Sequence, residues 1–319
     1  MPKIAIVDKI HPDGIALLEK NKNFEFEIIE DLSKNNLIKK LPNYDGITLR
    51  RGKIDSEILK NCKNLKVISR HGVGYDNVDV NFLRKNNIKL LITATSNSVS
   101  PAEHVMFMIL NISKGINLYD DSVRNGKFES IMHMRHENFQ LFKKKILIAG
   151  FGRIGRKLIK RCLGFDMHVY AYDPFVDQKT IESFGGIKIN DLEKGLKETD
   201  ILSLNVPLTN KTYNMINLKK IKLMKKTAII INTSRGGVIN EKDLNEALNQ
   251  KIIYGAGLDV FEKEPPHNSN PLLKNKRVVL SPHAATFTKE CLSDMSIETV
   301  KNIINFFENK LNNSAIVKL

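Results

Sequence analysis

Short apolar runs alternate with helical stretches over the first hundred residues. Strands are predicted at 4–7, 24–29, 46–49, 66–69 and 88–92, where mostly apolar residues stand together. Helices are predicted between them, at 12–20, 33–40, 55–61 and 79–86. Such alternation is typical of an α/β unit with a parallel sheet.

A second α/β unit is predicted after a long helix that begins at Pro101, whose apolar residues include Val105, Met108 and Ile112 on one stripe. Further strands are predicted near 144–149, 168–172, 200–205, 227–231, 252–257 and 277–280, followed by an amphipathic helix at 288–309. Because that last helix could return to the first unit, we expect the second unit to be inserted into the first.

A glycine turn opens the second unit. Gly150-Phe-Gly-Arg-Ile-Gly155 follows an apolar run and starts a helical one. The first glycine allows a tight turn, the second lets backbone approach a pyrophosphate, and the third lets the helix pack close to the sheet. Asp173 ends the next apolar run, 23 positions after Gly150, near the offset of about 20 typical of a ribose-binding carboxylate. This spacing predicts a dinucleotide site.

The same acid favours NAD over NADP. A carboxylate at position 173 would repel a 2′-phosphate and accept hydrogen bonds from a free 2′-hydroxyl. The following Pro174 and Phe175 offer no arginine to hold a phosphate.

Three later strand ends carry residues suited to hydride transfer to a carbonyl group: Arg235, Glu264 and His283. Ligands bind at the carboxyl ends of strands in open α/β sheets, so we expect these side chains to converge near the nicotinamide. A histidine can donate the proton. An arginine can bind a carboxylate and polarise the adjoining ketone, and a glutamate paired with the histidine would fix its orientation.

Several ordered motifs resemble the D-isomer-specific 2-hydroxyacid dehydrogenase family over nearly the whole chain. They are the glycine turn with Asp173-Pro174, Asn232-Thr-Ser-Arg-Gly236, Asp259-Val-Phe-Glu-Lys-Glu-Pro265, Ser281-Pro-His283, His71-Gly-Val-Gly-Tyr-Asp-Asn-Val-Asp79 and Asn97-Ser-Val-Ser-Pro-Ala-Glu103. The resemblance implies reversible hydride transfer between NAD and a 2-hydroxy/2-oxo acid, with Arg235, Glu264 and His283 as the catalytic triad. Where many members have two glycines after the histidine, this chain has Ala284-Ala285, which puts only the packing against the cofactor in doubt.

The expected fold class is α/β, with two Rossmann-like domains. An NAD-binding doubly wound parallel sheet, residues 99–287, would be inserted into a smaller flavodoxin-like substrate domain, residues 1–98 and 288–319. The resemblance implies substrate binding by the backbone amides of Val73 and Gly74 and by pocket residues that include Arg50, Asn97, Arg235 and, as one alternative, His71. Expected cofactor contacts are Gly150, Gly152, Arg153, Ile154, Gly155, Asp173, Pro174, Val206, Pro207, Thr212, Thr233, Ser234, Asp259 (on the nicotinamide carboxamide) and Ala285.

The substrate itself stays open. The segments 72–79 and 173–175 also resemble 3-phosphoglycerate dehydrogenase, although only 36 residues follow His283, too few for the regulatory domain of its long forms. Formate dehydrogenase is disfavoured because it pairs its histidine with glutamine rather than with a residue such as Glu264. A corepressor-like NAD-sensing protein is the alternative from another class, since such proteins share this fold and triad.

Charge near the first sheet suggests a further alternative. Arg50, Arg51, Arg70 and His71 fall at strand ends beside Gly72–Gly74. Cations held together in a cleft need an anion to offset their repulsion, so the substrate could carry a second anionic group. Alternatively, Arg51 and Arg70 point to solvent and only Arg50 touches a small neutral tail.

Composition adds few constraints. The net charge of +15 comes from scattered lysines without a clustered basic face, so no nucleic-acid partner is expected. No apolar run of membrane-spanning length and no leader are seen, and three widely spaced cysteines suggest neither disulfides nor a metal site. We expect a cytoplasmic protein without membrane or metal partners.

A homodimer through the NAD-binding domain is expected from the resemblance, with residues 117–140 reaching over the partner. Apolar residues there, such as Phe128 and Met132, are interrupted by basic ones. His133, Arg135 and His136 form either an ordinary polar surface or an arm that reaches the neighbouring subunit's site.

Overall fold

The computed structural model describes residues 1–135 and 137–319. Its chain divides into two compact units. Unit 1 comprises residues 1–97 and 286–319, and unit 2 comprises residues 98–285. His136, one of the residues of the expected arm, lies outside the described residues.

Unit 1 contains a five-stranded parallel sheet with the strand order β2-β1-β3-β4-β5. Its strands and helices are β1 (Lys3–Val7), α1 (Pro12–Lys20), β2 (Glu25–Ile29), α2 (Lys34–Lys40), η1 (Leu41–Asn43), β3 (Gly46–Leu49), α3 (Ser56–Leu59), β4 (Val67–Arg70), α4 (Val80–Lys85), β5 (Lys89–Ile92), α13 (Lys289–Phe307) and η3 (Asn313–Ala315). This order is the flavodoxin-like one, in which the chain reverses direction across the sheet between β1 and β3.

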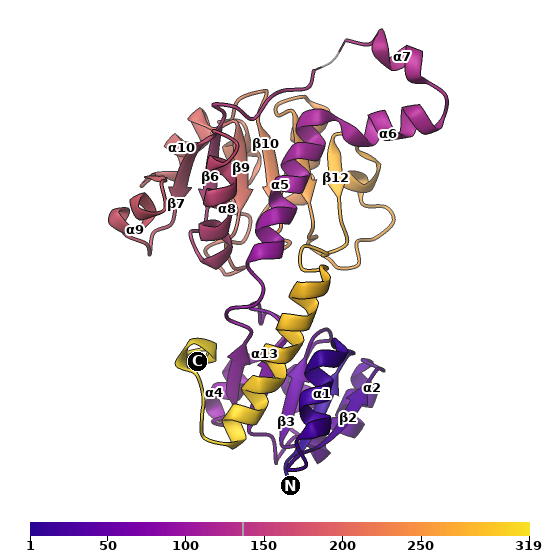
Figure 1. The fold of residues 1–319 in the computed structure, drawn as a ribbon, viewed down its shortest axis with the longest axis vertical. Helices are drawn as coiled ribbons and strands as arrows, with labels where there is room; N and C mark the ends of the chain where they lie inside the picture. Colours follow the sequence, from indigo (N-terminus) through magenta and orange to yellow (C-terminus); the bar gives the residue numbers. More distant parts are fainter. Residues whose placement is uncertain (136) are drawn as a thin grey trace. The chain divides into compact units, whose positions relative to one another are not determined.

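Helices α1 and α13 lie side by side on one face of this sheet (Figure 1). The contact is close because Gly14 has no side chain: a Cβ there would lie 2.1 Å from the Ser296 hydroxyl oxygen. Apolar residues of α13 share a core with β1, including Val300 and Ile303. The last helix of the chain therefore completes unit 1.

Unit 2 contains a seven-stranded parallel sheet with the order β12-β11-β10-β9-β6-β7-β8. Its elements are α5 (Val99–Lys114), α6 (Ile116–Arg124), α7 (Phe128–Met132), β6 (Lys145–Ala149), α8 (Arg153–Leu163), β7 (His168–Tyr172), α9 (Gln178–Ser183), β8 (Ile187–Lys188), α10 (Leu192–Glu198), β9 (Ile201–Leu204), α11 (Leu218–Ile221), β10 (Ile229–Asn232), α12 (Glu241–Asn249), β11 (Gly255–Leu258), η2 (Pro271–Lys274) and β12 (Val278–Leu280). Helices α5 and α8 pack next to each other over the sheet (Figure 1).

The expected fold class, two α/β parts with parallel sheets, is confirmed. The central strands β9, β10 and β11 are buried throughout, as expected where helices cover both faces of a parallel sheet. Helix α5 begins at Val99 rather than at Pro101, because a proline is tolerated in the first helical turn. Within the described residues, no helix has the length and apolar character needed to cross a membrane.

Candidate active site

The glycine turn of unit 2 lies where its sheet reverses strand order, between β6 and β9. Gly150 has φ +96°, and a Cβ there would come within 2.4 Å of the Asn205 carbonyl oxygen. A Cβ on Gly152 would meet nothing within 4 Å, and no side chain caps the N-terminus of α8. Backbone N–H groups at this helix end thus adjoin open space, which fits a pyrophosphate.

Asp173 stands directly after β7, beside this turn. Its two carboxylate oxygens accept hydrogen bonds from the backbone N–H groups of Phe151 (2.8 Å) and Phe175 (2.9 Å). These bonds fix the carboxylate and leave each oxygen able to accept another. The residues present therefore fit a dinucleotide with free ribose hydroxyls.

Other expected cofactor contacts follow β9 and β10. Val206, Pro207 and Thr212 belong to the loop after β9, where the Thr212 hydroxyl donates to the Pro207 carbonyl at 2.6 Å. Thr233 and Ser234 follow β10, and the side chain of Asn232 shapes that turn. Its amide oxygen accepts from the Ser234 N–H (3.0 Å), and its amide nitrogen donates to the Arg235 carbonyl (2.9 Å). Asn232 thus orients the backbone that carries Arg235.

His283 and Glu264 form a pair, with 2.7 Å between Nδ1 of the imidazole and a carboxylate oxygen. Both side chains are partly exposed, at 46% and 37%. Burial raises the pKa of Glu264, but the hydrogen bond and charge of His283, the Phe261 N–H and the charge of Arg235 outweigh it, so that this pKa lies below its ordinary value. The structure therefore brings together the three residues expected to do the chemistry.

The turns that carry Arg235 and Glu264 are in direct backbone contact. A Cβ on Gly236 would lie 1.7 Å from the Phe261 carbonyl oxygen. Beside this contact, Glu241 and Glu262 each accept the other's backbone N–H, at 2.6 and 3.0 Å. The reciprocal pair joins the start of α12 to the segment that leads to Glu264.

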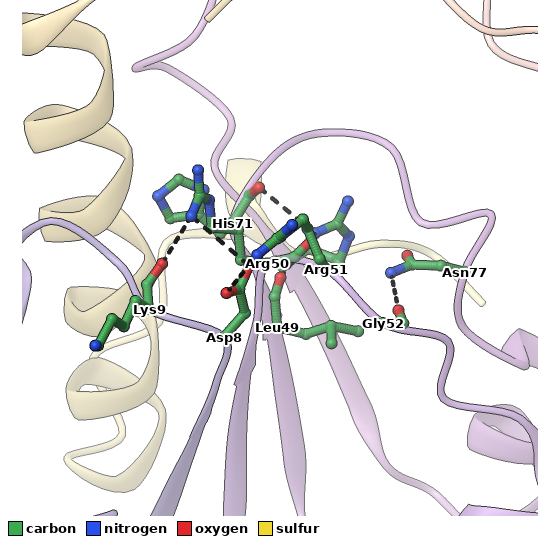
Figure 2. Close-up of polar contacts among 9 residues, drawn as sticks. Asp8, Lys9, Leu49, Arg50, Arg51, Gly52, His71 and Asn77 are labelled. Carbon is green, nitrogen blue, oxygen red and sulfur yellow. Dashed lines mark hydrogen bonds and ion pairs between the residues drawn. The ribbon is translucent and has the colours of Figure 1, made fainter. Parts of the chain in front are cut away.

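In unit 1, charged side chains gather at the ends of β1, β3 and β4 (Figure 2). Asp8 is 5% exposed and has φ +70°. Its carboxylate accepts two hydrogen bonds from Arg51, at 2.6 and 3.1 Å, and lies 3.7 Å from Arg50. Burial raises the pKa of Asp8, but hydrogen bonding and charge from Arg51 and the charge of Arg50 lower it below its ordinary value. Asp8 therefore supplies one negative charge beside two cations, and it pairs directly with Arg51.

Arg70 binds backbone carbonyl groups of the same region. Its guanidinium donates to the carbonyl oxygens of Gly74 (2.8 Å), Leu49 (2.7 Å) and Arg50 (2.6 Å). Arg50 itself donates to the Lys9 carbonyl at 3.0 Å (Figure 2). Arg51 is 71% exposed although it binds Asp8, as in the alternative in which it points to solvent, whereas Arg70 is half-buried and does not match that alternative.

The loop after β4 offers open hydrogen-bond donors. Among the described residues, the backbone N–H groups of Val73 and Gly74 have no hydrogen-bond acceptor. His71 is 6% exposed, and its Nε2 has no hydrogen-bond partner in the described part of the chain. Burial, and then the charges of Arg50 and Arg70, lower the pKa of His71 to about 4. Asn97 is also buried.

Asp8 was not among the residues expected from the sequence. The rule that located Arg50, namely that polar residues follow the strands of a parallel sheet, also applies to Asp8 directly after β1. No group of three or more His, Cys, Asp or Glu side chains in the described residues is placed to hold a metal ion.

Fold and site together define a two-unit α/β protein with an NAD-binding sheet and a histidine–carboxylate pair at its strand ends. Residues 106–285 match the family model described as D-isomer specific 2-hydroxyacid dehydrogenase, NAD binding domain. The chain belongs to the D-isomer-specific 2-hydroxyacid dehydrogenase family.

Relatives with different substrates resemble the chain about equally. It is 35% identical over 304 residues to a D-3-phosphoglycerate dehydrogenase of Archaeoglobus fulgidus, covering 95% of this chain but only 57% of the relative. It is 37% identical over 318 residues to a glyoxylate reductase of Thermococcus litoralis, covering 97% and 95% of the two chains. The structure of an Aquifex aeolicus D-lactate dehydrogenase with NAD and lactic acid covers 98% of both chains, with 28% identity and a TM-score of 0.86.

Proposed function

We propose that the protein is an NAD-dependent dehydrogenase that interconverts a D-2-hydroxy acid and its 2-oxo acid. The hydrogen-bonded His283–Glu264 pair carries this proposal. The pair lies at the carboxyl ends of strands of the unit 2 sheet, as do the glycine turn and Asp173, which fit NAD. The proposed division of labour assigns NAD to unit 2 and substrate-carboxylate binding to unit 1.

The residues of unit 2 would act as follows during reduction. NADH, when bound, supplies the hydride. Because Nδ1 of His283 is held by Glu264, Nε2 is the nitrogen that donates a proton to the forming alkoxide. The ionised Glu264 stabilises the protonated ring, and Arg235 stabilises the negative charge on the reacting oxygen.

Substrate binding is proposed for the loop after β4. The N–H groups of Val73 and Gly74 are suited to a carboxylate because they have no acceptor among the residues that the structure describes. Arg50, Asn97 and the neutral His71 would line the rest of the substrate's site.

The substrate is proposed to carry one negative charge. Asp8 pairs with Arg51 and lies near Arg50, and the Arg70 guanidinium donates to backbone carbonyl oxygens. Because these guanidinium groups already have partners within the chain, a second anionic group on the substrate is not needed to hold them in place. Glyoxylate and hydroxypyruvate are the preferred candidates, and 3-phosphohydroxypyruvate is the alternative.

A panel of 2-oxo acids with NADH, followed at 340 nm, tests these proposals. We expect singly charged acids to be preferred, and a tenfold preference for 3-phosphohydroxypyruvate, about 1.4 kcal/mol, would overturn the substrate assignment. The His283→Ala variant should lose activity by about 10² to 10⁴ while still binding NADH. NADH binding without turnover of any 2-oxo acid would favour the corepressor-like alternative.

A homodimer is proposed through α5, α6, α7 and α8. Helix α7 contains no buried residue, and Phe128 and Met132 on it are 56% and 63% exposed. Phe107 of α5 and Phe165 after α8 line a neighbouring hollow together with Met106, Leu110 and Ile116. A second copy would cover these apolar groups, and whether His133 or Arg135 then reaches the partner's site is part of the same proposal.

A cytoplasmic location is also proposed. Cys62, Cys162 and Cys291 are unpaired and buried, which is typical of proteins from reducing compartments. Cell fractionation with an antibody against the protein tests it.

A further inference from the structure

The turn that carries His283 is wrapped around one buried carboxylate. Asp259 is fully buried. One of its carboxylate oxygens accepts the Ala284 N–H at 2.7 Å and the Ser281 hydroxyl, and the other accepts the Ala285 N–H at 2.9 Å. The Asp259 carbonyl accepts the His283 N–H at 2.7 Å. These bonds hold His283 at φ +53°, a left-handed conformation that residues other than glycine rarely adopt.

Helix α5 is bonded to both ends of this turn. The Ser100 hydroxyl donates to the Ala285 carbonyl at 2.6 Å. Nε2 of His104 lies 2.9 Å from the Ser281 hydroxyl oxygen and 3.6 Å from the Asp259 carboxylate. Since Ser100 and His104 are four residues apart, they lie on one face of the helix.

The hydrogen-bond network sets the direction of the His104 contact. The Ser281 hydroxyl gives its single proton to Asp259. Its oxygen can therefore only accept from His104, so Nε2 of His104 carries a proton. His104 is thus the last donor in a chain that runs through Ser281 to the carboxylate inside the turn.

We propose that Ser100 and His104 are positioning residues for His283. Through the two ends of the turn they keep His283 in its left-handed conformation, with Nδ1 held by Glu264. The expected effects on catalysis rest on the proposed function, whereas the expected effects on the geometry of His283 do not.

The first turn of α5 links His283 to the boundaries of unit 2. Unit 2 begins at Ser98 and ends at Ala285, so the Ser100–Ala285 bond joins the two places where the chain enters and leaves the unit. A displacement of the first turn of α5 would therefore reach His283 through a single hydrogen bond.

Crystal structures of unliganded variants test the geometry. In His104→Leu and in Ser100→Ala we expect the 2.7 Å His283–Glu264 contact to be lost. His104→Gln should retain it, because the glutamine amide nitrogen can replace Nε2 as the donor. The exposed His168, changed to leucine, is the matched control.

Kinetics separate positioning from general damage. His104→Leu should lower kcat by about 10- to 100-fold, the scale expected for a small misplacement, with an unchanged Kd for NADH, and His104→Gln should restore it. Should His104→Leu fail to fold, Ser100→Ala carries the test. An intact His283–Glu264 contact in both His104→Leu and Ser100→Ala, or in Ser100→Ala alone if only it folds, overturns the positioning role. Loss of that contact in a protein whose wild type turns over no 2-oxo acid would instead overturn the proposed function and leave the positioning role standing.

Discussion

At the residue scale, His71 shows how burial changes what a side chain can do. Its pKa of about 4 means that the ring stays neutral near pH 7, so it adds no charge to the nearby Arg50 and Arg70. A neutral ring with an unpartnered nitrogen can accept a hydrogen bond from a substrate hydroxyl, which a protonated ring cannot do.

This burial also makes unit 1 sensitive to pH. The unfolded histidine binds a proton below its ordinary pKa of 6.5, whereas the folded one does so only near 4. The contribution of His71 to folding stability is therefore largest above pH 6.5 and is lost as the pH drops toward 4, by up to about 1.4 kcal/mol per pH unit. His71→Gln should reduce the loss between pH 7 and pH 5 by about 2 kcal/mol. Urea unfolding followed by circular dichroism measures the free energy of unfolding at the two pH values. An equal loss of stability in the wild type and in His71→Gln would refute the prediction.

We propose that Asp173 decides between the two dinucleotides, NAD and NADP. Charge-assisted hydrogen bonds to ribose hydroxyls contribute about 1.5–3 kcal/mol each, so Asp173→Ala should lower the preference for NADH over NADPH by at least about tenfold. The ratio of kcat/KM values for the two cofactors is the measurement. Glu182→Ala, an exposed acid on the nearby α9, serves as the control, and an unchanged ratio for Asp173→Ala would exclude the ribose role.

At the scale of elements, Gly236 shows why two loops must fold together. An alanine at this position would overlap the Phe261 carbonyl oxygen at 1.7 Å, so the turn after β10 and the segment before Glu264 would have to separate. Gly236→Ala should cost about 1–3 kcal/mol of stability and lower kcat by about 10². Thermal unfolding and steady-state kinetics measure both. Gly164→Ala is the control, because a Cβ there would lie no closer than 3.3 Å to its nearest neighbour, so little effect is expected. An effect of Gly236→Ala as small as that of Gly164→Ala would contradict the argument.

The sequence predicts elements well where periodicity is strong. Most strands of the two sheets are short apolar runs. Helix α1 is a clear amphipathic stripe, and its bounds match those expected. The strand β8 was missed because it has only two residues, too few to show a period. Helices α6 and α7 were expected only as part of the segment 117–140, although Ile116, Tyr119 and Val123 of α6 recur at helical spacing.

Sites are predictable where a motif fixes the backbone. The glycine turn, Asp173 and the His283–Glu264 pair lie where strand-end reasoning placed them. Asp8 also follows a strand, but its pairing with Arg51, 43 residues away, does not show in the sequence. Ser100 and His104 could not be found this way, since their partners are 185 and 177 residues away. Only the folded chain shows that a carboxylate neutralises Arg51 or that α5 touches the His283 turn.

At the scale of the whole molecule, the exposed apolar groups of α5 to α8 predict association. Light scattering at micromolar concentration should give twice the chain mass of 36.3 kDa. Phe128→Asp combined with Met132→Asp should shift the mass toward one chain by placing charges in the contact. The exposed Ile187, changed to aspartate, should not. A wild-type mass of 36.3 kDa would disprove the homodimer.

The insertion of unit 2 into unit 1 also orders events during synthesis. Domains generally fold as units while the ribosome extends the chain. Unit 2 is continuous from Ser98 to Ala285 and can fold once its own residues have emerged. The first 97 residues of unit 1 are made earlier, yet the apolar face on β1 and β4 is completed only by Val300 and Ile303 of α13, near the end of the chain. A nascent chain would thus expose this face throughout the synthesis of unit 2, which makes it a natural point of contact for a chaperone.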